Sequence, residues 1–199
     1  MTESHNYEMV QTWASDEALW APIMELNAEI LATRIGAVPD FHGQWSALDS
    51  AARQRLAHCP FLLVDAGFAR LQLWGGLPDT GVHEAPPPRT LQASTALSTP
   101  LLRRVLLLAW HMARSNRAGA RVALGMSGSC AGVLADCRLA DLEALAERRP
   151  AWIRLRWEQH TGVWRAWLSA AAQPSPRGLE RLQLWGLQTL AAEVRRRAD

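Results

Sequence analysis

The stretch TPLLRRVLLLAWHMARS, residues 99–115, contains the signals on which the fold prediction rests. Thr99 is a good N-cap, and Pro100 suits the first helical position, where its missing N–H is not needed. The run predicts a helix from Leu101 to about Ser115. Leu and Ala are abundant throughout the 199 residues, whereas Val and Ile are sparse and Tyr occurs once. Because β-branched residues and Tyr favour strands, we predict an all-α or mostly α protein, a multi-helix bundle without a large sheet.

Apolar residues at helical spacing, ended by Gly or Pro, predict the other helices. We expect helices over residues 22–35, 49–58, 61–74, 118–124, 129–136, 139–149, 163–172 and 179–197, with a loop over 38–45. Periodicity alone also allows a short strand within 61–74. Near residues 152–157 the chain alternates apolar and charged side chains, which predicts a short half-buried strand or hairpin: Ile153, Leu155 and Trp157 against Arg154, Arg156 and Glu158.

The chain divides by composition and charge. We expect a loose arm over 1–15, a helical part over 16–74, a Pro-rich loop over 75–100 and a basic helical part over 101–199, together forming one compact domain. Residues 1–99 carry 5 Arg and 11 Asp plus Glu, a balance of −6, and residues 100–199 carry 16 Arg and 8 acids, a balance of +8. Such asymmetry indicates an acidic partner such as nucleic acid, or one half that neutralises the other.

No catalytic or metal-binding pattern is complete. The stretch GMSGS, residues 125–129, resembles the GxSxG turn of α/β-hydrolases, but Ser129 replaces the last Gly and no parallel-sheet pattern surrounds it. Cys59, Cys130 and Cys137 lack the CxxC spacing of structural zinc sites and fit buried thiols. We therefore expect neither an enzyme nor a cofactor or metal site.

Two features indicate a cytoplasmic protein that stays outside the membrane. The N-terminus is polar and has no apolar signal core. The longest apolar stretch, around Val105 to Trp110, is far short of the roughly 20 residues that a membrane-spanning helix needs.

The turn Leu124-Gly125-Met126 lies between two expected short helices and resembles the turn of a helix-turn-helix unit. In such a unit the Gly adopts a left-handed conformation, and apolar residues on both sides pack the two helices together. The pattern is partial, because Arg121 stands where a small residue is usual and two Gly residues weaken the second helix.

Tryptophan and arginine are mixed in the C-terminal third. Five of the ten Trp residues lie there, at positions 152, 157, 164, 167 and 185, among Arg154, Arg156, Arg165 and Arg181. Arg and Trp together serve base stacking or partner binding. Large aromatic side chains also fill cores and dimer interfaces, and the sequence leaves both interpretations open.

The elements Leu106-Leu107-Leu108-Ala109, Leu124-Gly125, Val133-Leu134-Ala135 and Leu145-Ala146-Glu147 are similar in order and spacing to those of the flagellar transcriptional activator subunit FlhD. The resemblance covers roughly residues 102–160. It implies an all-helical bacterial homodimer that controls transcription on DNA together with a partner regulatory subunit. Members of that family are much shorter, so residues 1–100 and the expected helix over 179–197 have no counterpart.

Two hypotheses follow from the sequence. In the first, the protein is an FlhD-like regulator whose basic half contacts DNA: Arg114, Arg117 and Arg121 would contact phosphates, with Ser127 and Ser129 nearest the groove. In the second, it is a homo-oligomeric adaptor or protein-binding module whose Arg residues pair with the acidic N-terminal half. A continuous basic face would favour the first hypothesis, and Arg–carboxylate pairing between the halves would favour the second.

Overall fold

The Leu- and Ala-rich segments fold into helices, as the composition predicts. The computed structural model describes residues 17–35, 38–74, 99–148 and 153–198, and helices account for about three quarters of them. Two strands of two residues each, β1 (Val64–Asp65) and β2 (Arg154–Leu155), pair antiparallel, with Val64 opposite Leu155. The prediction of a mostly α-helical protein with a short strand near 152–157 is confirmed. No helix in the described ranges has the length and apolar character needed to cross a membrane.

The helical elements follow one another along the chain with short connections. They are α2 (Glu17–Ile30), the π-helix η1 (Leu31–Ile35), α3 (Pro39–Ala47), α4 (Ser50–Ala57), α5 (Leu71–Trp74), α6 (Thr99–Ser115), α7 (Arg117–Ala123), α8 (Gly128–Asp136), α9 (Leu139–Arg148), α10 (Thr161–Ala172) and α11 (Arg177–Ala198).

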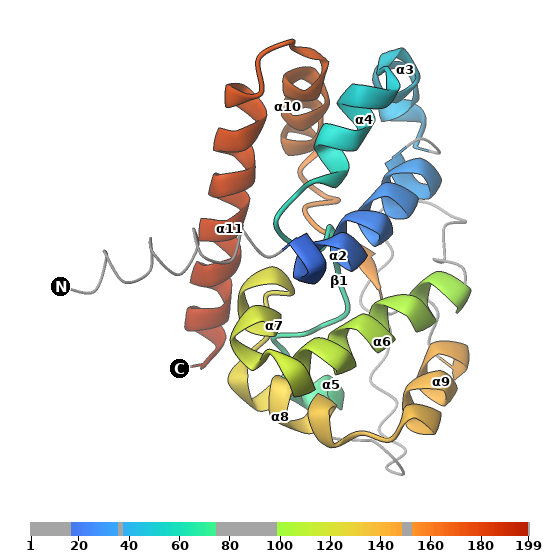
Figure 1. The fold of residues 1–199 in the computed structure, drawn as a ribbon, viewed down its shortest axis with the longest axis vertical. Coiled ribbons are helices and arrows are strands. Elements are labelled where there is room, and N and C mark those ends of the chain that lie inside the picture. Colours follow the sequence, from blue (N-terminus) through green and yellow to red (C-terminus); the bar gives the residue numbers. More distant parts are fainter. Residues whose placement is uncertain (1–16, 36–37, 75–98, 149–152, 199) are drawn as a thin grey trace, which may run out of the picture.

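The helices form two groups that share one core (Figure 1). Helices α3, α4 and α10 pack together at one end of the long axis, and α5 to α9 gather at the other, with α6 in contact with α7, α8 and α9. Helix α2 contacts both α4 and α6, and α11 runs along both groups, from α10 to α7. One cluster of buried side chains extends from Ile23 to Leu190, so it includes residues of the acidic and of the basic part of the chain.

A buried amide joins α2 to the segment that follows α4. Asn27 is completely buried, and its Nδ2 donates hydrogen bonds to the carbonyl oxygens of Phe61, at 2.9 Å, and of residues 57 and 59, at 3.4 Å each. Its Oδ1 accepts the backbone N–H of Leu63 at 2.9 Å. A buried polar group is costly unless it is paired, and here the pairing fixes an irregular stretch of backbone against a helix.

Several predicted elements have the predicted bounds to within a few residues. These are α4, whose N-cap Asp49 accepts the N–H of Ala52 at 2.7 Å, and the series from α6 to α11. The loose arm over 1–15 and most of the Pro-rich loop over 75–100 lie outside the described residues.

Two predictions failed where Pro was taken as a boundary. Residues 38–45 were expected to form a loop, but α3 begins at Pro39, which occupies the first helical turn, and it buries Phe41 and Trp45 four residues apart on one face. The first helix was expected to begin at Pro22, but α2 begins at Glu17 and contains Pro22. Tertiary packing of the apolar face outweighs the one backbone bond that the proline cannot make.

The helix predicted over 61–74 is wrong for most of its length. Residues 61–64 are consecutive, fully buried and extended, and they lead into β1, so only the short α5 at the end is helical. A continuous apolar run of this length suits a strand buried on both faces, which periodicity alone does not separate from a buried helix.

Candidate functional site

Helices α7 and α8 form the helix–turn–helix that the sequence suggests. Gly125 has a φ of +59°, so the predicted left-handed conformation is confirmed. The Ser127 hydroxyl accepts the N–H of Cys130 at 3.1 Å and thereby caps α8. Met126 donates its N–H to the carbonyl of Arg121 at 3.2 Å, which closes the end of α7. The chain therefore reverses within four residues between two packed helices.

The turn is held from below by a buried arginine. Arg156 is only 7% exposed; its Nη2 donates to the carbonyl of Leu124 and its Nε to the carbonyl of Leu62, each at 2.8 Å. The carbonyl of Leu124 is one of those that a helix leaves unpaired at its C-terminus. The period-two pattern placed Arg156 on an outward face with Arg154, and this interpretation is wrong because the guanidinium serves the backbone of two buried segments. Sequence reasoning had no signal for this role.

The backbone of the turn also lies close to α11. A Cβ at Gly125 would come within 3.2 Å of Leu190 Cδ2 and 3.4 Å of Arg156 Nη2. The turn is therefore buried on its inner side by α11, and only the outer sides of α7 and α8 face away from the protein.

The three predicted phosphate-binding arginines are all exposed. Arg114 lies in the last turn of α6, with its guanidinium carbon 4.7 Å from the centre of the Trp110 ring. Arg117 and Arg121 are four residues apart on α7, so they share one side of that helix. Within the described residues none of the three forms an ion pair. They form an exposed cationic patch, which we call the α7 patch.

An open pocket of about 540 Å³ lies beside this patch. Its lining consists of Ala113, Arg114 and Arg117 from the α6–α7 corner, with Ala135 and Asp136 from the end of α8. The structure thus brings Arg114 and Arg117 together at one concave surface. Asp136 adds a carboxylate to the same lining, so the pocket is of mixed charge.

The two predicted serines differ in their environment. Ser129 is exposed in the first turn of α8, whereas Ser127 is 6% exposed and its hydroxyl already caps that helix. We therefore take Ser127 out of the candidate contact set, because its hydroxyl is used within the fold. The exposed positions of α8 are Gly128, Ser129 and Asp136, so this helix carries no basic side chain outward. The candidate contacts are thus with phosphates rather than with base edges.

Arginines at the start of α6 are paired, unlike those at its end. Arg104 binds Glu29 and also lies 4.0 Å from Glu25, both on α2, which joins the basic half of the chain to the acidic half. Arg103 binds Glu147 at 3.2 Å. The pairing between halves that the second hypothesis expects is therefore present at Arg104 and absent, among described residues, at the α7 patch.

One further ion pair and the three thiols define the remaining ionisable chemistry. The Arg138 guanidinium, 3.0 Å from Asp141, lowers the pKa of that carboxyl. Burial raises the pKa of the thiols of Cys59, Cys130 and Cys137, and most strongly that of Cys59. Thiols with raised pKa are poor nucleophiles at neutral pH, which fits the structural role expected for them.

A second exposed surface was not singled out from the sequence. Leu184 and Trp185 on α11 are 41% and 42% exposed, between Arg177 and Arg181 on one side and further arginines near the C-terminus. The signal was available in the sequence, because positions 177, 181, 184 and 188 recur at helical spacing opposite the buried stripe. It was missed because the Trp residues were considered as one group, whereas Trp164 and Trp167 are buried and Trp185 is not.

Comparison with known proteins provides no assignment: no protein family, curated protein or solved structure matches this chain.

Proposed function

We propose that this protein is a DNA-associated regulatory protein, FlhD-like in its use of a helical bundle, which holds duplex DNA by its phosphates. The observation that carries the proposal is the α7 patch, in which Arg114, Arg117 and Arg121 are exposed beside a helix–turn–helix and form no ion pair among the described residues. Guanidinium groups bind phosphate oxygens through several parallel hydrogen bonds. Such contacts give affinity and register without sequence information.

The composition of α8 limits what kind of DNA binding is proposed. Its outward positions carry Gly128, Ser129 and Asp136, and these offer no bidentate donor for guanine. Ser129 is the one exposed hydroxyl in the first turn, where it lies close enough to the α7 patch to add a neutral hydrogen bond. We therefore expect binding with little sequence preference by this protein alone, and specificity would come from the partner subunit that the family resemblance implies.

The test is the salt dependence of binding to duplex DNA. Each phosphate neutralised by the protein contributes about −0.9 to the slope of log K against log salt concentration. Replacing Arg117 and Arg121 with Ala should therefore weaken binding for all sequences alike and flatten the slope by about 2. The measurement is fluorescence anisotropy with two unrelated labelled duplexes over a series of salt concentrations.

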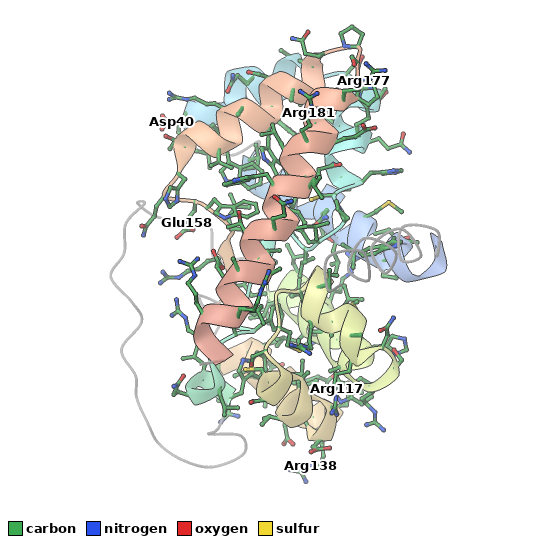
Figure 2. The ribbon with its side chains drawn as sticks, turned by 90° about the vertical axis from the view of Figure 1, so that its left-hand side faces the viewer. Asp40, Arg117, Arg138, Glu158, Arg177 and Arg181 are labelled. Atoms are coloured by element: carbon green, nitrogen blue, oxygen red, sulfur yellow. The ribbon has the colours of Figure 1, made fainter. Side chains whose placement is uncertain are left out.

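A matched control variant is available on α11. Arg177 and Arg181 are also exposed, four residues apart on one helix, and unpaired among described residues, but they lie at the opposite end of the molecule from Arg117 (Figure 2). Replacing both with Ala removes the same charge and should leave the slope unchanged. An equal effect of the two double variants, or no binding to any duplex at low salt, would contradict the proposal.

A protein-binding module is the second candidate, because α11 presents two large apolar side chains to the outside. Exposed Trp and Leu between Arg residues is the composition of protein interfaces rather than of an ordinary surface helix. A homodimer, which the resemblance implies, belongs to this candidate. Light scattering at micromolar concentration tests it, since a stable mass near the 22.0 kDa of one chain would rule the dimer out.

A further inference from the structure

The outward face of α11 is a long surface with apolar residues in the middle and arginines at both ends. The helix has 22 residues and buries one stripe, which includes Leu179, Leu190 and Val194. The opposite stripe is exposed, and we call it the α11 face; it comprises Arg177, Arg181, Leu184, Trp185, Arg195 and Arg196. At a rise of about 1.5 Å per residue this face is roughly 28 Å long. Figure 2 shows α11 along the side turned toward the viewer, with Arg177 and Arg181 at its upper end.

The charges of the α11 face are of one sign. Among the described residues none of its four guanidinium groups is in an ion pair, and Arg195 and Arg196 donate only to backbone carbonyls of their own helix. The two carboxylates of α11 lie beside this stripe: Glu180 on one flank and Glu193 toward the buried side, where it is partly covered. The face therefore offers four cations around an apolar centre.

The apolar centre is pre-organised by the aromatic residues beneath it. The Trp185 ring lies 5.6 Å from that of Trp157, centre to centre, and Trp157 packs in turn on Phe61 at 5.7 Å and on Trp167 at 5.9 Å. Trp157 has a φ of +52°, a conformation that a bulky residue seldom adopts and that the surrounding packing must impose. An aromatic side chain held in this way loses little freedom when a partner covers it.

We propose that the α11 face is the docking surface for an acidic amphipathic helix of a partner protein. Leucine-like side chains of that helix would cover Leu184 and Trp185, and carboxylates near its two ends would pair with the arginines at the two ends of the face. This inference develops the second candidate function and does not depend on DNA binding.

Charge decides between this occupant and the alternatives. In an antiparallel pair of two copies, the Arg177 and Arg181 end of one face would meet the Arg195 and Arg196 end of the other, and in a parallel pair each arginine would meet its own copy. Both arrangements place like charges together. A DNA backbone would satisfy the arginines but would leave Leu184 without an apolar partner. An acidic helix with an apolar middle satisfies both parts of the face.

The test uses a fluorescein-labelled synthetic helix of about 20 residues, with Leu at i, i+3, i+4 and i+7 in its middle turns and Glu at both ends. A second peptide keeps the Leu residues and has Lys in place of Glu. We expect the Glu peptide to bind the full-length protein with an affinity that falls as salt rises, and to change the fluorescence of the protein's Trp. The Lys peptide should bind at least about tenfold more weakly.

Variants locate the binding. Arg177→Ala with Arg181→Ala, and separately Leu184→Ala, should each weaken the Glu peptide by about tenfold or more. Leu184→Ala is preferred to a change at Trp185, because Trp185 also packs on Trp157. Arg117→Ala with Arg121→Ala is the control and should leave peptide binding unchanged, although it is expected to weaken DNA.

Three results would overturn the inference. One is equal binding of the two peptides, or no binding of either at 100 µM, a concentration about one hundred times a micromolar Kd. Another is a dimer that Leu184→Ala converts to a monomer, which would make a second copy the occupant. The last is displacement of the bound peptide by duplex DNA in the α7-patch double variant, which would make nucleic acid the occupant. The first result leaves the DNA proposal intact, because the two assays respond to different arginine pairs.

Discussion

Gly186 is the point at which α11 approaches the aromatic cluster of the core, and its replacement by Ala gives a sharp test of that packing. A Cβ at this position would lie 2.5 Å from Phe61 Cζ, 2.8 Å from Phe61 Cε1 and 3.1 Å from Trp157 Cη2. Carbon atoms in contact prefer about 3.5–4.0 Å, so the Phe61 ring would have to move by about 1 Å. It is completely buried and touches the rings of Trp157 and Trp167, which leaves it little room.

Two opposing terms set the expected change in the free energy of unfolding. Ala is favoured over Gly inside a helix by about 1 kcal/mol. Overpacking a well-filled core costs about 1–3 kcal/mol. Gly132, at the centre of α8, has no atom within 4 Å of the place of a Cβ, so Gly132→Ala should show the helix term alone. We expect Gly186→Ala to be about 1–3 kcal/mol less stable than Gly132→Ala.

Urea unfolding followed by circular dichroism measures this difference, and thermal unfolding should show it as about 2–4 °C per kcal/mol for a chain of this size. The variant Phe61→Leu supplies a second check. If the clash with the ring is the cause, combining Phe61→Leu with Gly186→Ala should cost less than the sum of the single changes. The reasoning fails if Gly186→Ala is stabilised as much as Gly132→Ala, because the helix would then not touch the aromatic cluster as described.

Three further predictions concern stability and reactivity. Asn27→Ala should lower the free energy of unfolding by about 3 kcal/mol or more in urea titrations, because three carbonyls and one N–H lose their buried partner; a loss below 1 kcal/mol would mean that water replaces the amide. Ser127→Ala should cost about 1 kcal/mol through loss of the α8 N-cap, and Ser127→Asn should recover most of that loss if capping is the cause. Iodoacetamide labelling at pH 8, followed by mass spectrometry, should modify the partly exposed Cys137 first and Cys59 only on unfolding, since burial raises the pKa of the Cys59 thiol; equal rates would contradict this order.

The candidate sites were predictable in proportion to how far they depend on local sequence. The helix–turn–helix was found because Gly125 and the apolar residues around it act within a few positions of one another. The exposure of Arg114, Arg117 and Arg121 was also foreseeable, because an Arg residue is rarely buried. The role of Ser127 was missed, because a serine just before a helix signals a cap as readily as a contact.

The sequence by itself determined the fold class and most helices, because capping residues, Pro and apolar spacing act over a few positions. Asp49 begins α4 and Pro100 lies in the first turn of α6 for reasons that are complete within one turn of helix. The tertiary structure alone decided that residues 61–64 are extended, since Asn27 and Arg156, each more than 30 positions away, pair with their backbone. It also decided which arginines are paired with acids and which are exposed, because Glu29 and Arg104 meet only when α2 packs on α6. Long-range partners satisfy backbone groups and charges that no local pattern in the sequence reveals.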